Sequence, residues 1–277
     1  MFEFADDTAE RRLAAAARRG VRVRVVLDQR EERTNTGAYQ YLRSHEVRVV
    51  WSSPRYTYTH QKTLIIDGSK AVIMTANLTS RYYSTTRDFL VVDSRRADVA
   101  AIVKVFNADY DQRPIQPGDG RDLVWSPTDS QERLLALING AASSLRIYSE
   151  EMGDSTIEDA LIAAARRGVS VRVCGENQDG ESDSDFARLA RGGVRISYYH
   201  SPDGFYIHGK VIEYIHGKVI EADYGTRHAK VFIGSENFSN TSLNQNRELG
   251  LITASRAVLS SIARTFAADF RNGKQWS

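Results

Sequence analysis

At two distant places in this 277-residue chain, a histidine and a lysine two residues apart are followed by an aspartate at the same spacing. The first pair opens the segment "HQKTLIIDG" and the second opens "HGKVIEADY", and an aspartate follows each lysine by five residues. The residues concerned are His60, Lys62, Asp67, His216, Lys218 and Asp223. One such pair on a strand means little, but two copies at identical spacing predict a shared site.

A hydroxyl residue, an asparagine and a carboxylate follow each pair. In both sets the carboxylate comes eleven residues after the asparagine and directly after an arginine. The two sets are Thr75, Asn77 and Asp88, then Ser235, Asn237 and Glu248. We expect the hydroxyls and asparagine amides to bind phosphate oxygens together with the lysines, because cationic and polar hydrogen donors match that anion.

This set of residue types suits the cleavage of a phosphodiester. One histidine can attack phosphorus while the other protonates the leaving alcohol, and the roles reverse when water enters. Asp88 and Glu248 would accept a hydrogen bond from the far ring nitrogen of a histidine and so hold its tautomer. Because the lysines supply positive charge, we expect neither a metal ion nor another cofactor.

The spacing within each motif predicts different tasks for its members. Side chains alternate between the two faces of a strand, so His60 and Lys62 project from one face and Asp67 from the other. The second copy has the same parity. We therefore expect the histidine and lysine of each copy to converge on the substrate, whereas Asp67 and Asp223 have a structural role.

The elements that carry these residues are written twice along the chain. The segment "LAAAARRGVRVRVV" (13–26) matches "LIAAARRGVSVRVC" (161–174), and "TRDFLVVD" (86–93) matches "NRELGLIT" (246–253). Each copy alternates helical segments with short β-branched strands. That alternation predicts an α/β fold of two homologous halves, each a mostly parallel sheet flanked by helices.

The repeat also predicts where the halves divide. The segment 112–129 holds three of the five prolines and is typical of a linker. We expect an N-terminal half at 1–111 and a C-terminal half at 130–277. The N-terminal half lacks counterparts of the helix 131–141 and of most of the strand "SLRIYSE", which favours a truncated or minimal N-terminus.

The doubled motifs, the "GSEN" at 234–237 and the "RELG" at 247–250 resemble the phospholipase D superfamily over essentially the whole chain. The resemblance implies two halves related by a pseudo-twofold axis around one active site. It also implies a phosphohistidine intermediate that needs no metal, with His60 as the nucleophile and His216 as the general acid. The N-terminal half has "MTAN" (74–77) in place of "GSEN", but Thr75 keeps the hydroxyl.

The octapeptide "YIHGKVIE" occurs twice in succession, at 206–213 and 214–221. The first copy, with His208 and Lys210, keeps the upstream distance to the preceding "SP". The second copy, with His216 and Lys218, keeps the downstream distance to the aspartate. Because strand register is fixed by partners on both sides, and one strand cannot hold both copies, we favour the second copy as the working one.

Composition limits the function only weakly. A hydrophobic content of 42%, 26% charged residues and a net charge of +2 are ordinary for a soluble globular protein, cytoplasmic or secreted. The apolar runs are too short to cross a bilayer, and residues 1–20 lack the pattern of a signal peptide. The single Cys174 excludes an intrachain disulfide.

The substrate class stays open between phospholipid and nucleic acid. Aromatic residues crowd the approach to the motifs, and they suit a lipid interface or stacking on bases. Because one chain carries both motifs, we favour a phospholipase D-type phosphodiesterase acting on phospholipid. The alternatives are an endonuclease, a cardiolipin synthase-like phosphatidyltransferase and, in another class, a non-catalytic relative that binds phosphate.

Overall fold

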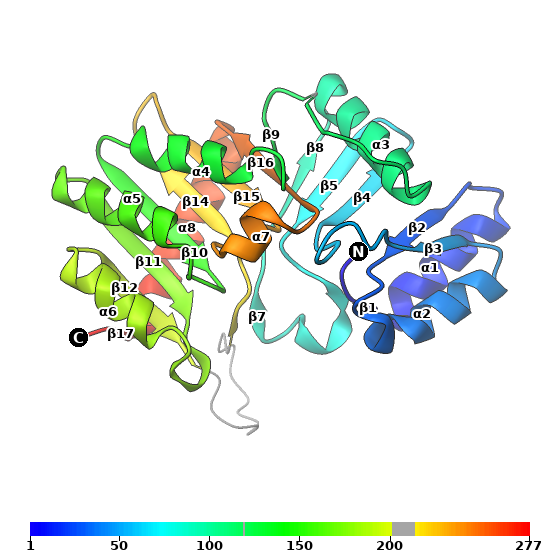
Figure 1. The fold of residues 1–277 in the computed structure, drawn as a ribbon, viewed down its shortest axis with the longest axis horizontal. Helices are drawn as coiled ribbons and strands as arrows, with labels where there is room; N and C mark the ends of the chain where they lie inside the picture. The colour runs from blue at the N-terminus through cyan, green and yellow to red at the C-terminus, as the bar shows by residue number, and fades with distance from the viewer. Residues whose placement is uncertain (119, 201–213) are drawn as a thin grey trace.

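The computed structural model describes residues 1–118, 120–200 and 214–277, which form two α/β halves lying side by side (Figure 1). The helices are α1 (Asp7–Arg18), α2 (Glu32–Ser44), α3 (Arg96–Tyr110), α4 (Ser130–Asn139), α5 (Ser155–Arg166), α6 (Asp183–Arg191), α7 (Asn240–Asn244) and α8 (Arg256–Asn272), with short 3-10 turns η1 (Ser80–Tyr82) and η2 (Gln178–Gly180). The strands are β1 (Phe4–Ala5), β2 (Arg24–Leu27), β3 (Arg48–Trp51), β4 (Lys62–Ile66), β5 (Lys70–Met74), β6 (Leu78–Thr79), β7 (Thr86–Arg87), β8 (Leu90–Asp93), β9 (Leu123–Ser126), β10 (Ser144–Ser149), β11 (Ser170–Glu176), β12 (Arg195–Tyr199), β13 (Tyr214–Ile215), β14 (Val219–Ala222), β15 (Lys230–Gly234), β16 (Glu248–Thr253) and β17 (Lys274–Gln275).

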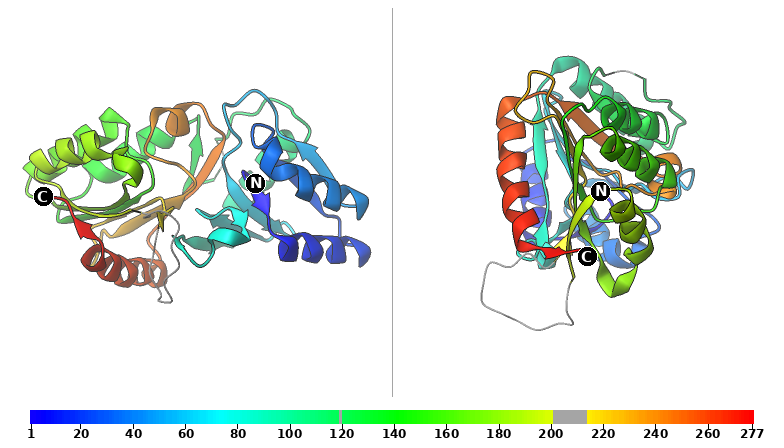
Figure 2. Two further views of the ribbon diagram at one scale, coloured as in Figure 1. Left: turned by 90° about the horizontal axis from the view of Figure 1, so that it is seen from below. Right: turned by 90° about the vertical axis from the view of Figure 1, so that its left-hand side faces the viewer.

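The C-terminal half is built on one eight-stranded sheet in the order β17-β12-β11-β10-β14-β15-β16-β9. Helices α4, α5 and α6 cover one face, and α8 covers the other (Figure 2). Leu134, Ile157 and Phe186 bury the first face, while Phe266 of α8 packs on the second with Tyr148. The sheet therefore forms the middle of three layers.

The N-terminal half has its strands in several small groups. Strand β2 pairs with β3, β1 pairs with β6, and β4, β5 and β8 form a three-stranded group, while β7 pairs with β13 of the other half. Helices α1 and α2 pack on β2 and β3 around Leu27, Leu42 and Val49. One apolar cluster contains Ile73 from this half and Ile233 from the other, so the halves share buried surface.

The duplicated helix begins and ends in the same way in both halves. The Asp6 carboxylate accepts hydrogen bonds from the backbone of Thr8 and Ala9 at the start of α1, and Asp154 does the same at the start of α5. Gly20 and Gly168 follow the two helices with φ of 88° and 91°, a conformation that costs other residues free energy. The two copies of the repeat therefore begin and end this helix with the same residue types.

The predicted α/β fold of two repeats is confirmed, but the sheets are mixed rather than mostly parallel. In the C-terminal sheet β10, β11 and β12 are parallel, whereas β14, β15, β16 and β9 each pair antiparallel with their neighbours. The reason is that β14 and β15, like β4 and β5, are joined by short turns rather than by helices.

The predicted linker 112–129 is not structureless throughout. Its later part contains β9, which pairs with β16 at the edge of the C-terminal sheet. Asp129 lies at the N-cap position of α4 and its carboxylate accepts from the Trp125 backbone at 2.9 Å. Proline content marked the crossing between the halves but did not reveal the strand inside it.

Within the described ranges, no helix has both the length and the apolar character needed to cross a bilayer.

Candidate functional site

The two histidine-lysine segments meet at the seam between the halves. Thr59, just before the first pair, forms a parallel bridge with Arg247 of the C-terminal half. Strand β13, just before the second pair, runs parallel to β7 of the N-terminal half, with Ile215 opposite Arg87. Each motif therefore enters the site alongside the acidic segment of the opposite half.

Two ion pairs repeat this exchange between the halves. Arg87 donates to both carboxylate oxygens of Asp269, at 2.7 and 3.0 Å. Arg247 is fully buried, and its Nε lies 3.3 Å from Asp109 in the N-terminal half. The arginine that precedes each acidic residue thus fastens the opposite half, as a pseudo-twofold arrangement requires.

His60 is bound to the carboxylate supplied by the other half. Its Nδ1 lies 2.9 and 3.0 Å from the two oxygens of Glu248, and its Nε2 lies 2.7 Å from the Nζ of Lys62. Burial lowers the pKa of His60, and the negative charge of Glu248 opposes that shift. With Nδ1–H donating to Glu248, the neutral ring keeps the lone pair of Nε2 for a substrate.

His216 is bound to a carboxylate of the opposite half in the equivalent way. Its Nδ1 lies 2.7 Å from Asp88 of the N-terminal half. Burial would raise the pKa of Asp88, but the hydrogen bond and charge of His216 hold it at about 2. The carboxylate is therefore ionised at neutral pH and available to orient the imidazole.

Both lysines of the motifs are buried in the site. Lys62 is 1% exposed and Lys218 is 0% exposed. Burial, followed by the positive charge of Lys218, lowers the pKa of Lys62 to about 7. Because the positive charge of Lys218 disfavours an ammonium at Lys62, an anion bound beside both lysines would stabilise the site.

Glu150, which sequence reasoning missed, is a further charged residue beside His216 and Lys218. One of its oxygens contacts Lys218 Nζ, and the other lies 3.7 Å from His216 Nε2. Burial would raise the pKa of Glu150, but His216 and Lys218 hold it below its ordinary range. His216 thus lies beside two carboxylates, Asp88 from the N-terminal half and Glu150 from its own, and Glu150 also contacts Lys218.

The repeat puts Phe2 at the position equivalent to Glu150, 148 residues earlier. The Phe2 ring packs against His60 with 4.5 Å between centroids, and Lys62 Nζ lies 5.0 Å from its centre. One motif therefore faces an aromatic ring where the other faces a carboxylate. The internal alignment was the signal that could have revealed this difference.

The two asparagines are held by equivalent glutamates. The Asn77 side chain accepts from the Glu3 backbone at 3.3 Å and donates to its carboxylate at 3.4 Å. Burial raises the pKa of Glu151, and hydrogen bonds with Ser239 and Asn237 oppose that shift. The two amides therefore have equivalent carboxylate partners, Glu3 for Asn77 and Glu151 for Asn237.

The two hydroxyls have a different arrangement from the predicted phosphate contact. Thr75 Oγ1 donates to Asp88 at 2.6 Å and accepts from the Phe89 backbone at 2.9 Å. Ser235 Oγ accepts from the Leu249 backbone at 3.1 Å. Both hydroxyls are fully buried and connect the end of β5 or β15 to the segment at the start of β8 or β16.

The two motif aspartates lie away from the histidines and differ in their contacts. Asp223 accepts hydrogen bonds from the backbone N–H groups of Ala142, Ser143 and Ser144, at 2.7 to 3.1 Å. Asp67 has the same left-handed backbone, φ 51° against 53°. Among the described residues Asp67 has no hydrogen-bond partner.

The second copy of the octapeptide occupies the site. The Ile215 backbone N–H donates to the buried Glu176 at 2.9 Å, and Lys218 donates to the His216 carbonyl at 2.7 Å. Burial raises the pKa of Glu176 to about 8. The first copy, with His208 and Lys210, lies outside the described residues.

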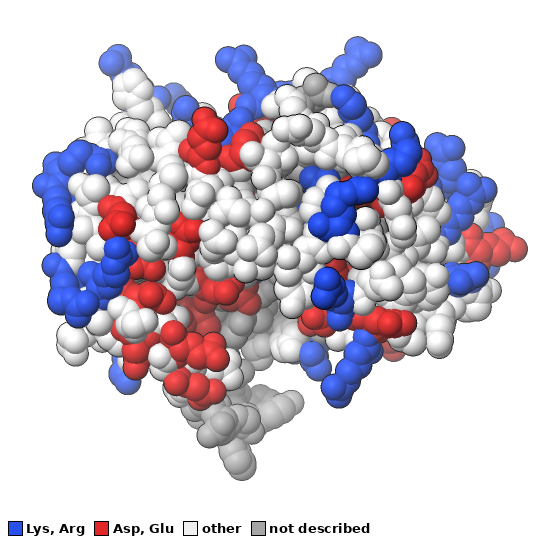
Figure 3. All heavy atoms as spheres, in the orientation of Figure 1, with Lys and Arg blue, Asp and Glu red and all other residues white. Residues whose placement is uncertain are grey.

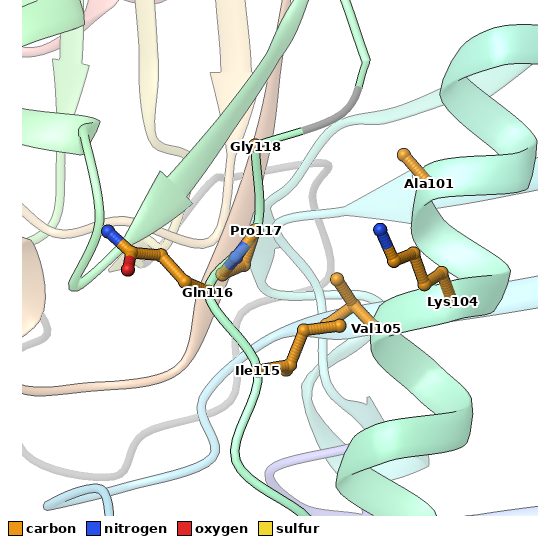
Figure 4. A pocket seen from close by; sticks show the side chains of 7 residues that line it. All are labelled: Ala101, Lys104, Val105, Ile115, Gln116, Pro117 and Gly118. Atoms are coloured by element: carbon orange, nitrogen blue, oxygen red, sulfur yellow. The ribbon is translucent and has the colours of Figure 1, made fainter.

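A small pocket beside α3 is separate from this site (Figure 4). It measures about 10 Å³ and is lined by residues such as Lys104, Ile115 and Pro117. That volume holds about one water molecule, which excludes it as a substrate site.

Comparison with known proteins identifies the family of the two halves. The family model described as "Cardiolipin synthase, PLD-like domain" matches residues 1–110 and 134–270. No curated protein matches the chain.

Two solved structures cover nearly the whole chain. A polyphosphate kinase from Porphyromonas gingivalis is 17% identical, with a TM-score of 0.70 over 98% of this chain and 45% of that one. A phosphatidylserine synthase from Haemophilus influenzae is 12% identical, with a TM-score of 0.67 over 98% of this chain and 78% of that one. The chain thus spans less than half of the kinase, and both likenesses show the fold alone.

Proposed function

The chain belongs to the phospholipase D superfamily, and from this premise we propose that it cleaves or transfers a phosphodiester through a covalent phosphohistidine. The observation that carries the proposal is the crossed pairing of His60 with Glu248 and of His216 with Asp88 around two buried lysines. Two oriented imidazoles and two ammonium groups supply a nucleophile, an acid and charge neutralisation.

In the first step His60 Nε2 attacks phosphorus, and the bond from phosphorus to the leaving alcohol breaks. His216 gives its proton to the alcohol oxygen. In the second step water gives a proton to His216, its oxygen attacks phosphorus, and the P–N bond breaks. If a second alcohol enters instead of water, the product is a new phosphodiester.

Lys62 must move before His60 can react, because its Nζ lies 2.7 Å from the attacking nitrogen. A phosphodiester oxygen would draw the ammonium away from the ring and into a charge-assisted contact. In this proposal, substrate binding therefore also frees Nε2 of His60 from its contact with Lys62.

The difference between Phe2 and Glu150 supports His60 as the nucleophile. The apolar ring beside His60 favours a neutral imidazole. Asp88 and Glu150 flank His216, so an imidazolium there would have counterions on both sides. That asymmetry matches a neutral nucleophile opposite a protonated acid.

Phospholipid is the substrate class that we favour. Tyr82 and Tyr83 are 40% and 49% exposed, and amphipathic rings of this kind suit a lipid interface. Acidic side chains gather on the lower part of the C-terminal half on the face drawn in Figure 3, and the first turn of α6 contains Asp183 and Asp185. Negative charge there disfavours a long polyanion such as nucleic acid.

The test is a parallel assay of phosphatidylcholine, cardiolipin precursors with a lipid alcohol, bis-(p-nitrophenyl) phosphate and single-stranded DNA. A rapid quench with labelled substrate should trap an acid-labile phosphoryl adduct that His60→Ala lacks. Activity should survive excess EDTA, because the lysines carry the positive charge. An adduct that persists in His60→Ala would reassign the nucleophile, and turnover of DNA alone would overturn the lipid proposal.

A further inference from the structure

A buried acid stands at the end of the same strand in both halves. Asp28 directly follows β2 and is 1% exposed, and Glu176 ends β11 and is 4% exposed. The offset of 148 residues between the two repeated helices also separates these two acids. Among the described residues neither acid forms an ion pair with a lysine or an arginine. Burying a carboxyl group away from any cation costs free energy, so its presence in both halves calls for a reason.

Both acids bind the backbone directly before a motif histidine. The Thr59 N–H donates to the side chain of Asp28, and the Ile215 N–H donates to the side chain of Glu176. Thr59 and Ile215 are buried, and a buried N–H group needs a hydrogen-bond partner. In both motifs that partner is an acidic side chain rather than the carbonyl of a neighbouring strand. The two acids therefore make the same contact in the two halves.

Each histidine is thus held by two acids from different halves. The opposite half supplies the carboxylate that binds the imidazole ring. The acid that binds the preceding backbone comes from the histidine's own half, Asp28 for His60 and Glu176 for His216. The contact at the ring sets its rotation and tautomer, whereas the contact at the backbone sets the position of the Cα atom. Together the two contacts define where the reactive nitrogen lies.

We propose, on the basis of the proposed function, that Asp28 and Glu176 are positioning residues, the first for His60 as nucleophile and the second for His216 as general acid. Among the described residues neither acid contacts a histidine ring, so both act through the backbone of the motif. A reacting group displaced by about 1 Å can slow a reaction by about 10²-fold. Loss of either backbone contact should therefore be visible in turnover.

The two acids differ in the number of groups that they bind. One oxygen of Asp28 binds Thr59, and the other accepts from the backbone N–H groups of Arg30 and Glu31 at 2.8 and 3.2 Å. Glu176 binds Ile215 with one oxygen, and its other oxygen is buried with no hydrogen-bond partner among the described residues. An amide can therefore replace Glu176 without losing a contact. At Asp28 the amide NH2 would face a backbone N–H.

The turn after each strand explains this difference. In the C-terminal half Asn177, the residue after Glu176, accepts from the Ser182 backbone at 2.9 Å and donates to Asp183 at 2.8 Å. Asn177 thus stabilises the turn there, whereas Asp28 binds both its turn and its motif in the N-terminal half. Glu176 is therefore left to serve the motif.

The protonation of Glu176 allows its position to be tested apart from its charge. Burial, with a smaller contribution from the charge of Glu150, raises the pKa of Glu176 to about 8 against the effect of the Ile215 hydrogen bond. At pH 6 the carboxyl group is therefore mostly protonated. A neutral side chain in its place leaves the charge of the site nearly unchanged.

The test compares Glu176→Met with Glu176→Gln at pH 6. Methionine fills a similar space but is a weak acceptor for the Ile215 N–H, whereas the glutamine oxygen can accept it. Glu176→Met should lower kcat about 10²-fold on the best alkyl phosphodiester of the parallel assay. The loss on bis-(p-nitrophenyl) phosphate should be much smaller, because nitrophenolate leaves without a proton from His216. Glu176→Gln should keep both rates.

Asp28→Asn should give the opposite pattern. Because His60 attacks phosphorus in both substrates, this variant should slow formation of the phosphoryl adduct by a similar factor on each. The asparagine should also fail to restore the wild-type rate, since Asp28 uses both oxygens. An Asp28→Asn protein as active as the wild type would remove Asp28 from the proposal.

The NMR signals of isotope-labelled histidine rings report on position without any turnover. Glu176→Met should shift the ring signals of His216 and leave those of His60 in place, and Asp28→Asn should do the reverse. If the wild-type protein turns over no phosphodiester, the proposed function fails, and these ring signals alone then decide whether the acids position the histidines. Signals that stay in place in both variants would overturn the positioning role.

Glu158→Met is the matched control for lost stability. Glu158 is a buried acid of α5 that binds Arg188. Its loss should lower Tm without changing the ratio of the two kcat values. If Glu176→Met does not fold, Glu176→Asp replaces it in both measurements, because it keeps the acid but shortens its reach by one methylene. Equal losses on the two substrates in the Glu176 variant, with no shift of the His216 signals, would overturn the proposal.

Discussion

Nδ1 of His60 lies 2.9 Å from the carboxylate of Glu248, a residue 188 positions later in the opposite half. His216 has the same relationship with Asp88. Each histidine is therefore oriented by a group that its own half does not contain. The site exists only when both halves are docked, which explains why the arginines next to these acids fasten the same seam.

Glu248→Gln should lower kcat by about 10³-fold with little change in KM, because the amide cannot hold the His60 tautomer as the carboxylate does. Steady-state kinetics on the best substrate of the parallel assay would measure this. The adduct should also form more slowly in a rapid quench.

Glu236→Gln is the matched control. Glu236 is also fully buried in the C-terminal half, and burial together with the charge of Glu248 raises its pKa well above the ordinary value. The raised pKa favours the protonated form, and neither buried carboxyl oxygen has a hydrogen-bond partner among the described residues, so a neutral amide should leave kcat nearly unchanged. Equal losses in the two variants would mean that Glu248 acts through folding alone.

Glu150→Gln should reduce turnover of substrates with poor leaving groups more than turnover of bis-(p-nitrophenyl) phosphate. The reason is that Glu150 helps to balance the charge of His216, whose proton a poor leaving group needs and a nitrophenolate does not. The ratio of the two kcat values measures the effect. His216→Ala should show the same dependence, and a uniform loss on both substrates would contradict this role for Glu150.

The low pKa of Lys62 predicts that anion binding depends on pH. Below about pH 7 the ammonium is present, and above it the folded protein must take up a proton before an anion can bind. The Kd for sulfate, which does not itself titrate in this range, should rise up to about tenfold per pH unit above 7. Calorimetry in buffers of different ionisation enthalpy would measure the proton uptake.

Lys62→Arg provides the comparison, since a guanidinium stays protonated throughout this range. Sulfate binding to that variant should be weaker in absolute terms but nearly flat between pH 6 and about 9. A wild-type Kd that is equally flat would show that Lys62 keeps an ordinary pKa.

The sequence predicted which side chains the structure brings together better than it predicted the layout of the sheets. Repeated spacing singled out His60 and His216 because the motif is local. Which acid serves which histidine could not be predicted, because that depends on how the halves dock. The hydrogen bond from Thr75 to Asp88 was not predicted either, since a hydroxyl at a strand end can reach a neighbouring segment as easily as a ligand. Its contact with phosphate stays a prediction.

Glu150 escaped notice for a different reason. It ends a strand that carries no motif, and only the three-dimensional packing of β10 against β14 brings it to Lys218. The mixed strand directions were not predicted. Alternating helices and strands favour helical crossovers between parallel strands, whereas the motif strands are joined to the next strand by short turns. The sequence therefore predicted the local motifs, but it did not predict which strands and side chains pair over long distances in the chain.

The duplicated octapeptide gives the last prediction. His216 contacts Asp88 in the site, and Lys218 lies beside it. His216→Ala should therefore reduce turnover by several orders of magnitude, as loss of a member of a catalytic unit does. His208→Ala should keep most of the activity, because the second copy alone satisfies the spacing to Asp223.

Deletion of residues 206–213 is the sharper experiment. The remaining "YIHGKVIEAD" restores the distance to the preceding "SP" and keeps the distance to Asp223, so the shortened chain should fold and turn over substrate at least as well. Deleting 214–221 yields the identical sequence, so only the point substitutions distinguish the copies. If His208→Ala abolishes activity while His216→Ala does not, the first copy fills the site and Asp223 lies eight residues too far along to serve it.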